Sequence, residues 1–356
     1  MGLFKDMLGG GESLFKNEEA LDLDFVPKLL PFRDQQQHHV ARCIKPLLEG
    51  RNGTNMFIHG APGIGKTAAI KWVFRDLADT TDDVHVVYVN CWQRNTSYQV
   101  LLGICDELGY AFTQNKRQDE LMEIIKGMCN KKAVVFCFDE IDKVEDLDFL
   151  YSILQDIFKR SVILITNYKE WLGDMEQRVK SRFLPDVIEF KPYNRDETKK
   201  ILQDRVGFAF VPGCWNAEAL DIIVDKAAHA QDIRSGIFLM RQAALAAENA
   251  SSRKIMPEHA QSAVAKLSDM LVQRTDDLED DTKLVLDVIK AAGGGKSGDL
   301  FKVYKEKSGE GSYKTFARKV EKLAKAVLIK TNKIVGGPEG TTTLITLSSS
   351  KNLADF

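Results

Sequence analysis

The sequence has no long apolar run and no excess of charge of either sign. Among its 356 residues, the longest unbroken apolar stretch is the six residues 133–138, whereas a membrane-spanning helix needs about 20. The 49 basic and 51 acidic residues leave a formal net charge of −2. These values argue against membrane insertion and exclude a uniformly basic nucleic-acid binder, but they allow a basic face on one domain.

Cysteine, glycine and proline are also sparse. The six cysteines, at positions 43, 91, 105, 129, 137 and 214, form no C-x-x-C pair. Neither a disulfide framework nor a zinc site is therefore expected, and the reducing cytoplasm is the expected compartment. With 25 glycines and 9 prolines, the chain is not expected to be mostly disordered or collagen-like. The N-terminal residues lack the apolar stretch of a secretory signal.

Between residues 25 and 192, short apolar runs alternate with amphipathic stretches. The runs are rich in β-branched and aromatic residues and lie at 56–58, 84–89, 133–138, 162–165 and 187–190. Strands that alternate with helices in this way indicate a parallel sheet covered by helices, which is an α/β fold. Residues 1–24 are weakly patterned and contain three glycines in a row at 9–11, so they are expected to form a mobile N-terminal arm.

After residue 192 the apolar runs give way to helical patterns. Helices are expected at 194–207, 216–230, 232–250 and 257–273, with Asn194, Asn216 and Asp232 as N-caps. They predict an all-α domain over residues 193–275. Residues 276–350 contain three further helical segments and then two apolar runs around a glycine-rich turn. Three helices followed by a β-hairpin predict a winged helix.

A phosphate-binding loop follows the first apolar run and precedes a helical pattern. Its sequence matches G-x-x-x-x-G-K-[ST] over Gly60, Ala61, Pro62, Gly63, Ile64, Gly65, Lys66 and Thr67. Backbone N–H groups of such a loop, with the start of the following helix, bind phosphate oxygens. Lys66 would reach the β and γ phosphates, and the Thr67 hydroxyl would bind Mg²⁺. The loop predicts an ATP or ADP site.

Polar side chains end two other runs. Asp139 and Glu140 follow the run at 133–138, where Asp139 would hold Mg²⁺ and Glu140 would orient or deprotonate the attacking water. Asn167 ends the run at 162–165 and would position that water or respond to the γ phosphate; an ordinary turn asparagine is the competing interpretation.

Three arginines are candidates for phosphate contacts from another subunit or domain. Arg178 and Arg182 precede the last strand of the sheet, and Arg234 lies at the start of an expected helix. Guanidinium groups suit phosphate because they are planar, bidentate and always charged. Arginines on helices more often form surface ion pairs, and the residues alone leave both interpretations open.

The combination resembles the AAA+ ATPases, and within them the archaeal replication initiators homologous to origin recognition complex subunit 1 and cell division control protein 6. The resemblance covers about residues 13–348. It is carried by the phosphate loop, by Phe138 to Asp142, by Thr166-Asn167 and Ser181-Arg182-Phe183, and by the segments at 25–33, 88–91 and 191–194 with the terminal winged helix.

The resemblance implies roles for particular residues. Val26, Pro31 and Arg33 would line the adenine pocket, and Ala68, Tyr193 and Ile201 would complete the nucleotide site. Lys66, Glu140, Asn167 (as sensor 1) and Arg182 (as arginine finger, with Arg178 second) would form the catalytic set, and Arg234 would be sensor 2. Relatives usually carry glycine where this chain has Gln231. A helical insertion at about residues 93–116 would touch DNA.

The expected winged helix is strongly basic. Residues 300–335 contain ten basic and three acidic residues, a net charge of +7 within a chain of −2. On the helix that starts at Tyr313, apolar residues recur at Phe316, Val320, Leu323 and Ala324, which predicts one buried face. The expected DNA contacts are Lys314, Thr315, Arg318, Lys319 and Lys322. A solvated lysine-rich helix is the alternative.

The sequence therefore predicts a slow ATPase that initiates DNA replication. It would bind double-stranded origin DNA, use ATP and ADP as a conformational switch, and help load the replicative helicase, with other initiator subunits as further partners. It would be cytoplasmic and nucleoid-associated, with no membrane partner. A signalling-type P-loop ATPase that uses its winged helix for protein contacts is the alternative. That class is expected to carry a further domain after the winged helix, whereas nine residues follow Leu347 in this sequence, which counts against it. A clamp-loader-like ATPase is a third possibility and would end in a helical collar, whereas this sequence predicts a β-hairpin there.

Overall fold

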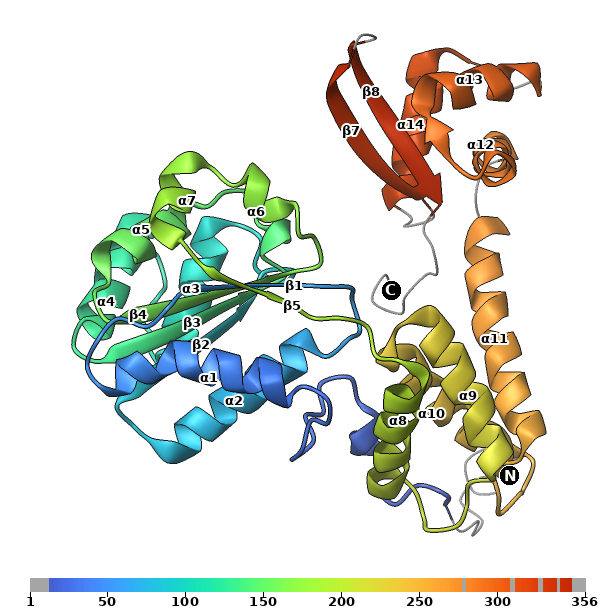
Figure 1. The fold of residues 1–356 in the computed structure, drawn as a ribbon, viewed down its shortest axis with the longest axis horizontal. Helices are drawn as coiled ribbons and strands as arrows, with labels where there is room; N and C mark the ends of the chain where they lie inside the picture. The colour runs from blue at the N-terminus through green and yellow to red at the C-terminus, as the bar shows by residue number, and fades with distance from the viewer. Residues whose placement is uncertain (1–12, 277–279, 308–310, 326–328, 338–339, 348–356) are drawn as a thin grey trace. The chain divides into compact units, whose positions relative to one another are not determined.

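The computed structural model describes residues 13–276, 280–307, 311–325, 329–337 and 340–347. They form two compact units, which are described separately (Figure 1). The sheet unit comprises Asp22–Asp204 and Gln231–Ile233. The helical unit comprises residues 13–21, Arg205–Ala230 and the described residues from Arg234 onward.

The sheet unit is built on five parallel strands in the order β2-β3-β4-β1-β5. Their bounds are Met56–His59 (β1), Val84–Asn90 (β2), Ala133–Asp139 (β3), Arg160–Thr166 (β4) and Asp186–Glu189 (β5). Each strand coincides with one of the five apolar runs, so the predicted parallel α/β fold is confirmed. Every residue of β3 is buried, as expected of an interior strand with helices on both faces.

Helices cover both faces of this sheet (Figure 1). One face packs against α1 (Asp34–Leu48) and α2 (Lys66–Thr80). The other packs against α3 (Ser97–Glu107), α4 (Gln118–Cys129), α5 (Asp148–Asp156) and α7 (Gln177–Phe183). The short elements η2 (Ile141–Lys143) and α6 (Trp171–Asp174) follow β3 and β4.

The carboxyl ends of the strands carry the predicted chemistry. His59, the last residue of β1, is in register with Thr166, the last residue of β4, and β3 ends next to them at Asp139. Ligands of open α/β sheets bind outside the carboxyl ends of the strands. The phosphate loop after β1, Glu140 after β3 and Asn167 after β4 are therefore positioned at one edge of the sheet.

The predicted helices after residue 192 are present. They are α8 (Arg195–Ala209), α9 (Ala217–Ala230), α10 (Ile233–Asn249) and α11 (Pro257–Asp276). Asn216 caps α9, because its Oδ1 accepts hydrogen bonds from the N–H groups of Glu218 (2.8 Å) and Ala219 (3.3 Å). The division between the two units falls inside α8, after Asp204, and domain boundaries at residues 192 and 275 remain predictions.

Residues 13–21 depart from the expected mobile arm. Leu14 and the end of η1 (Glu18–Leu21) are buried, Phe15 forms a β-bridge with Phe210, and Arg205 donates a hydrogen bond to the Ala20 carbonyl at 2.7 Å. These contacts anchor the segment on the helical unit because its apolar side chains find partners there, which its sequence does not reveal. The first twelve residues of the predicted arm lie outside the described residues.

The winged-helix segment, residues 280–347, follows the predicted order. Its elements are α12 (Asp280–Ala292), β6 (Gly295–Lys296), α13 (Ser297–Glu306), α14 (Tyr313–Lys325), β7 (Ile329–Gly337) and β8 (Gly340–Leu347). The three strands form one sheet in the order β6-β8-β7. Phe316, Val320 and Leu323 are buried in a core with residues of α12 and α13, so the predicted buried face of α14 is confirmed. No helix in the described part of the chain is long and apolar enough to cross a membrane.

Candidate functional site

The phosphate loop has a backbone that only glycine adopts readily. Gly63 and Gly65 have φ values of +72° and +88°, a region in which a Cβ atom is unfavourable. A Cβ atom at Gly65 would also lie 2.9 Å from the Tyr193 hydroxyl. Gly65 directly precedes α2, so the loop presents the start of that helix to a ligand. This arrangement fits the phosphates of a nucleotide.

The Lys66 ammonium forms hydrogen bonds to the phosphate loop and to Asn167. Its side chain is buried, and Nζ donates hydrogen bonds to the carbonyl oxygens of Gly60 (2.8 Å) and Ala61 (2.8 Å). The same ammonium donates to Oδ1 of Asn167 at 2.7 Å. A buried ammonium in a loop of this shape is suited to bind phosphate oxygens.

Thr67 and Asp139 form a pair of oxygen ligands beside the loop. The Thr67 hydroxyl donates to Oδ2 of Asp139 at 2.6 Å, and the Glu140 N–H donates to its Oδ1 at 2.9 Å. Hydroxyl and carboxylate oxygens are the ligands that Mg²⁺ prefers. The residues present therefore fit a magnesium ion, as the sequence predicts.

Tyr88 is a site residue that sequence reasoning missed. Its hydroxyl donates to the same Asp139 Oδ2 at 2.8 Å, and burial together with Asp139 raises the pKa of Tyr88 well above its usual value. The tyrosine is visible in the apolar run at 84–89, but its meeting with Asp139 depends on the pairing of β2 with β3. Tyr88 thus orients the carboxylate that the sequence assigns to the metal.

Glu140 and Asn167 complete a chain of contacts. The Asn167 amide donates from Nδ2 to Oε2 of Glu140 at 3.1 Å, while its Oδ1 accepts from Lys66. Burial, with Asp139 and Asp142 nearby, raises the pKa of Glu140 above its usual range. One amide therefore connects the phosphate-binding lysine to the candidate base. This contact favours a site residue over an ordinary turn asparagine.

Replacing Tyr88 by phenylalanine tests its positioning role. The variant keeps the ring and loses one of the hydrogen bonds to Asp139, so we expect about tenfold more Mg²⁺ to be needed for half-maximal ATPase rate. The cost in folding free energy should be only about 1 kcal/mol. Tyr98→Phe is the matched control, because it removes a hydroxyl bonded to the Lys116 carbonyl at the surface. An unchanged Mg²⁺ requirement in Tyr88→Phe would contradict the role.

Arg33 supports the backbone of the phosphate loop through hydrogen bonds. Its buried guanidinium donates to the Ile64 carbonyl (2.8 Å), the Lys191 carbonyl (2.8 Å) and the Tyr193 hydroxyl (2.9 Å). It also lies over the Tyr193 ring, 3.9 Å from the centroid. The structure thus places Arg33 and Tyr193 against the loop backbone, and contact of either with adenine remains a prediction.

The other residues expected at the nucleotide lie in different elements. A cavity of about 420 Å³ between α1, α2 and the segment before α1 is lined by Pro31, but neither Val26 nor Arg33 lines it. Ala68 lies half-buried in the first turn of α2, and Ile201 lies half-buried in α8. Their roles toward a nucleotide remain predictions.

The candidate arginines differ in their surroundings. Arg178 forms ion pairs with Glu176 (2.6 Å) and Asp148 (2.5 Å). Arg182, exposed on the same helix, lies over the Tyr151 ring at 4.7 Å and has no ion pair within the described residues. Arg182 thus has no competing acid among the described residues, and its role as an arginine finger remains a prediction. Arg234 belongs to the helical unit, so its contact with the nucleotide remains a prediction.

Gln231 adopts a backbone conformation that favours glycine. It has a φ of +54°, a left-handed conformation that costs a non-glycine residue about 1 kcal/mol. The turn that it forms packs on the phosphate loop, where the Ile233 N–H donates to the Gly63 carbonyl at 3.2 Å. The departure from glycine therefore leaves the turn intact.

The candidate DNA-binding residues of α14 divide into two groups. Lys314 and Arg318 are exposed, and Thr315 is half-buried. Lys319 does not project into solvent: it forms an ion pair with Asp281 and donates to the Tyr304 hydroxyl at 3.4 Å. Its prediction as a DNA contact is corrected, because the acid of α12 lies within reach of its ammonium. The side chain of Lys322 lies outside the described residues.

The expected DNA-contacting insertion at 93–116 forms α3 and the loop that follows it. Thr96 caps α3 by accepting a hydrogen bond from the Gln99 N–H at 3.3 Å. Phe112, in the loop, is 77% exposed. The structure thus leaves an aromatic side chain at the surface of this segment, and its contact with DNA remains a prediction.

Family models and curated proteins match this chain. A family model described as an AAA domain matches residues 50–170, and one described as a Cdc6 AAA+ ATPase-type lid domain matches residues 199–265. The ORC1-type DNA replication protein 2 of Methanothermobacter thermautotrophicus is 30% identical over 96% of this chain and 94% of that protein. The ORC1-type DNA replication protein 2 of Methanosarcina acetivorans is 30% identical over 85% of this chain and 84% of that protein.

Solved structures share the fold. The Orc1 protein of Aeropyrum pernix, in complex with DNA, aligns over 95% of this chain and 94% of its own, with a TM-score of 0.71 and 26% identity. Cdc6p of Pyrobaculum aerophilum aligns over 95% of each chain, with a TM-score of 0.65; at 19% identity it supports the fold alone. The chain therefore belongs to the archaeal ORC1/Cdc6 family of AAA+ replication initiators.

Proposed function

We propose that this initiator binds double-stranded origin DNA through its winged-helix segment and uses bound ATP or ADP as a conformational switch. The observation that carries the DNA half is the surface of α14. Lys314 and Arg318 are exposed one helical turn apart, while Phe316 and Val320 are buried in the core. A helix with one apolar face and one cationic face is suited to enter a groove and bind phosphates.

The nucleotide half rests on the contacts at the edge of the sheet. Lys66 would bind the β and γ phosphates, and Thr67 with Asp139 would hold Mg²⁺, which supplies positive charge beside them. Glu140 would accept a proton from water, and its contact with Asn167 supports this role because it orients the carboxylate. We propose slow turnover by the single chain, because an arginine supplied by a neighbouring subunit would accelerate hydrolysis.

Assembly would supply that arginine from Arg182. Its exposure and the ring of Tyr151 beneath it leave the guanidinium available to a neighbouring initiator subunit. Arg234 would contact the nucleotide from the helical unit, so that the arrangement of the units depends on which nucleotide is bound. Loading of the replicative helicase and a place at the nucleoid are proposed from the family and from DNA binding.

Fluorescence anisotropy of labelled duplexes tests the proposal. The full chain is titrated into origin-candidate and scrambled DNA, with ADP or a non-hydrolysable ATP analogue, over a salt series. We expect a preference for one sequence that survives higher salt and depends on the nucleotide. Arg318→Ala should weaken binding by about 1–3 kcal/mol and reduce the sequence preference if it contacts a base. Lys314→Ala should weaken all duplexes alike and lower the salt slope by about one.

Lys302→Ala is the matched control on the neighbouring helix, where Lys302 pairs with Asp299 at 3.5 Å. It removes one positive charge from the same segment without touching α14. Weak binding that disappears equally for both duplexes, or equal losses for Lys302→Ala and Arg318→Ala, would contradict DNA readout by α14. The result would favour the alternative, a P-loop switch whose winged helix contacts protein.

A further inference from the structure

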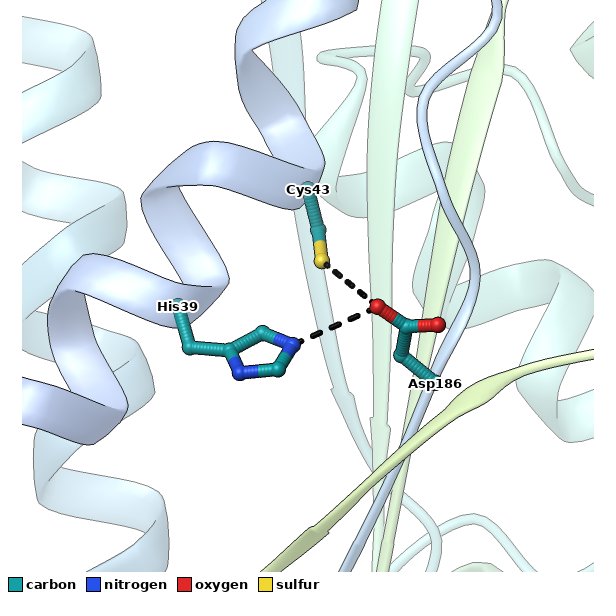
Figure 2. A group of neighbouring side chains, drawn as sticks. All are labelled: His39, Cys43 and Asp186. Carbon is teal, nitrogen blue, oxygen red and sulfur yellow. Dashed lines mark hydrogen bonds and ion pairs between the residues drawn. The ribbon is translucent and has the colours of Figure 1, made fainter.

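Three side chains with metal-binding atoms meet away from the nucleotide site (Figure 2). His39 and Cys43 lie one turn apart on α1, and Asp186 is the first residue of β5. His39 Nε2 lies 3.3 Å and Cys43 Sγ lies 3.7 Å from the same oxygen, Oδ2 of Asp186. All three ligand atoms lie within 4.8 Å of one another.

These separations match the edges of a tetrahedral zinc site. With bond lengths of about 2.3 Å to sulfur and about 2.0 Å to nitrogen and oxygen, tetrahedral angles place N and O about 3.3 Å apart and S and O about 3.5 Å apart. The observed distances of 3.3 Å and 3.7 Å are close to both values. The third pair, the His39 nitrogen and the Cys43 sulfur, lies within 4.8 Å and would close to about 3.5 Å around the ion.

The backbone around the three residues is held in place independently of any ion. The Thr54 N–H donates to the Cys43 carbonyl at 2.9 Å, and the Asp186 N–H donates to the Asn55 carbonyl at 2.9 Å. Residues 54 and 55 directly precede β1, so both ligand-bearing elements are tied to the same short segment. Such preorganisation lowers the cost of assembling a site.

The surroundings favour a thiophilic cation with one open position. Cys43 is 5% exposed, whereas the side chains of His39 and Asp186 are 35% and 54% exposed. The thiolate therefore lies on the protein side and a fourth ligand would come from solvent. Imidazole, thiolate and carboxylate together select Zn²⁺ and similar transition metals over Mg²⁺ or Ca²⁺.

We propose that His39, Cys43 and Asp186 bind one Zn²⁺ ion, with water as the fourth ligand. On binding, the Cys43 thiol loses its proton to solvent, so that thiolate and carboxylate balance the two charges of the ion. The ion joins α1 to β5. Arg33, just before α1, and Tyr193, four residues beyond β5, brace the phosphate loop, so the site lies between two elements that support nucleotide binding.

Cobalt titration of the metal-free full chain tests the site. Co²⁺ bound to a thiolate absorbs strongly in the near ultraviolet, whereas Co²⁺ on oxygen ligands does not. Excess Mg²⁺ is included to occupy Thr67 and Asp139. We expect one Co²⁺ per chain with a thiolate band, and loss of that band when colourless Zn²⁺ displaces it. Cys43→Ser should abolish the band, and His39→Gln or Asp186→Asn should raise the Kd for Co²⁺ at least tenfold.

Two variants serve as matched controls. His38→Gln changes the neighbouring histidine of α1, which bonds to the Asp34 carbonyl through Nδ1, and Cys105→Ser changes another buried cysteine of the sheet unit. Both should retain the band and the stoichiometry. Absence of the band in the unaltered chain, or its persistence in Cys43→Ser, would overturn the proposal and leave a hydrogen-bonded triad. His39 and Asp186 are partly exposed, so their variants test the site even if Cys43→Ser fails to fold.

Discussion

Replacing Lys66 by alanine is expected to abolish nucleotide binding, with a rise of at least about 100-fold in the Kd for ATP. The Lys66 ammonium is buried at the mouth of the phosphate loop and donates to Gly60, Ala61 and Asn167. Charge-assisted hydrogen bonds to phosphate are roughly twice as strong as neutral ones, and burial strengthens them. Alanine removes both the charge and the bond to Asn167. Titration with a fluorescent ATP analogue measures the loss.

Lys126→Ala is the matched control for this prediction. Lys126 lies on α4, where its ammonium pairs with Glu123 at 3.4 Å at the surface, so we expect an unchanged Kd. DNA binding at low salt by the full-length Lys66→Ala chain should persist, because the winged-helix segment has its own core. ATP binding by Lys66→Ala within threefold of the unaltered chain would contradict the assignment of the loop.

Replacing Glu140 by glutamine should reduce ATP turnover by about 10²–10³-fold and leave ATP binding intact. Glutamine keeps the shape of the side chain and can still accept from Asn167 Nδ2, which lies 3.1 Å from Oε2 of Glu140. It cannot accept a proton from water, and a positioned general base contributes about 10²–10⁴-fold to a rate. Single-turnover hydrolysis and an ATP-binding titration on the same preparation separate the two effects.

Glu145→Gln makes the same exchange five residues farther along, at an exposed position, and should leave turnover unchanged. Full turnover in Glu140→Gln would show that another group activates water. Equal losses of binding and turnover would instead show that Glu140 supports the loop rather than the reaction. The two outcomes distinguish a base from a structural residue at this position.

Much of the fold and the centre of the site could be predicted from the sequence. The strands follow from short β-branched runs, and α14 follows from the spacing of Phe316, Val320 and Leu323, all of which are buried. Lys66, Thr67 and Asp139 can be predicted to lie together because strand ends and phosphate loops have local sequence patterns. The parallel sheet then brings those ends to one edge, so a local pattern is sufficient to predict a shared site.

The tertiary structure alone decided which distant side chains meet. Tyr88 forms a hydrogen bond with Asp139 because β2 pairs with β3, and Lys319 forms an ion pair with Asp281 instead of facing solvent. Cys43 and Asp186 are separated by 143 positions, so no spacing rule could join them. Sequence periodicity reports which face of an element is buried, but the partner across that face depends on how separate elements pack. The physical reason is that a side-chain contact depends on the positions of two secondary-structure elements, whereas a local sequence pattern describes only one of them.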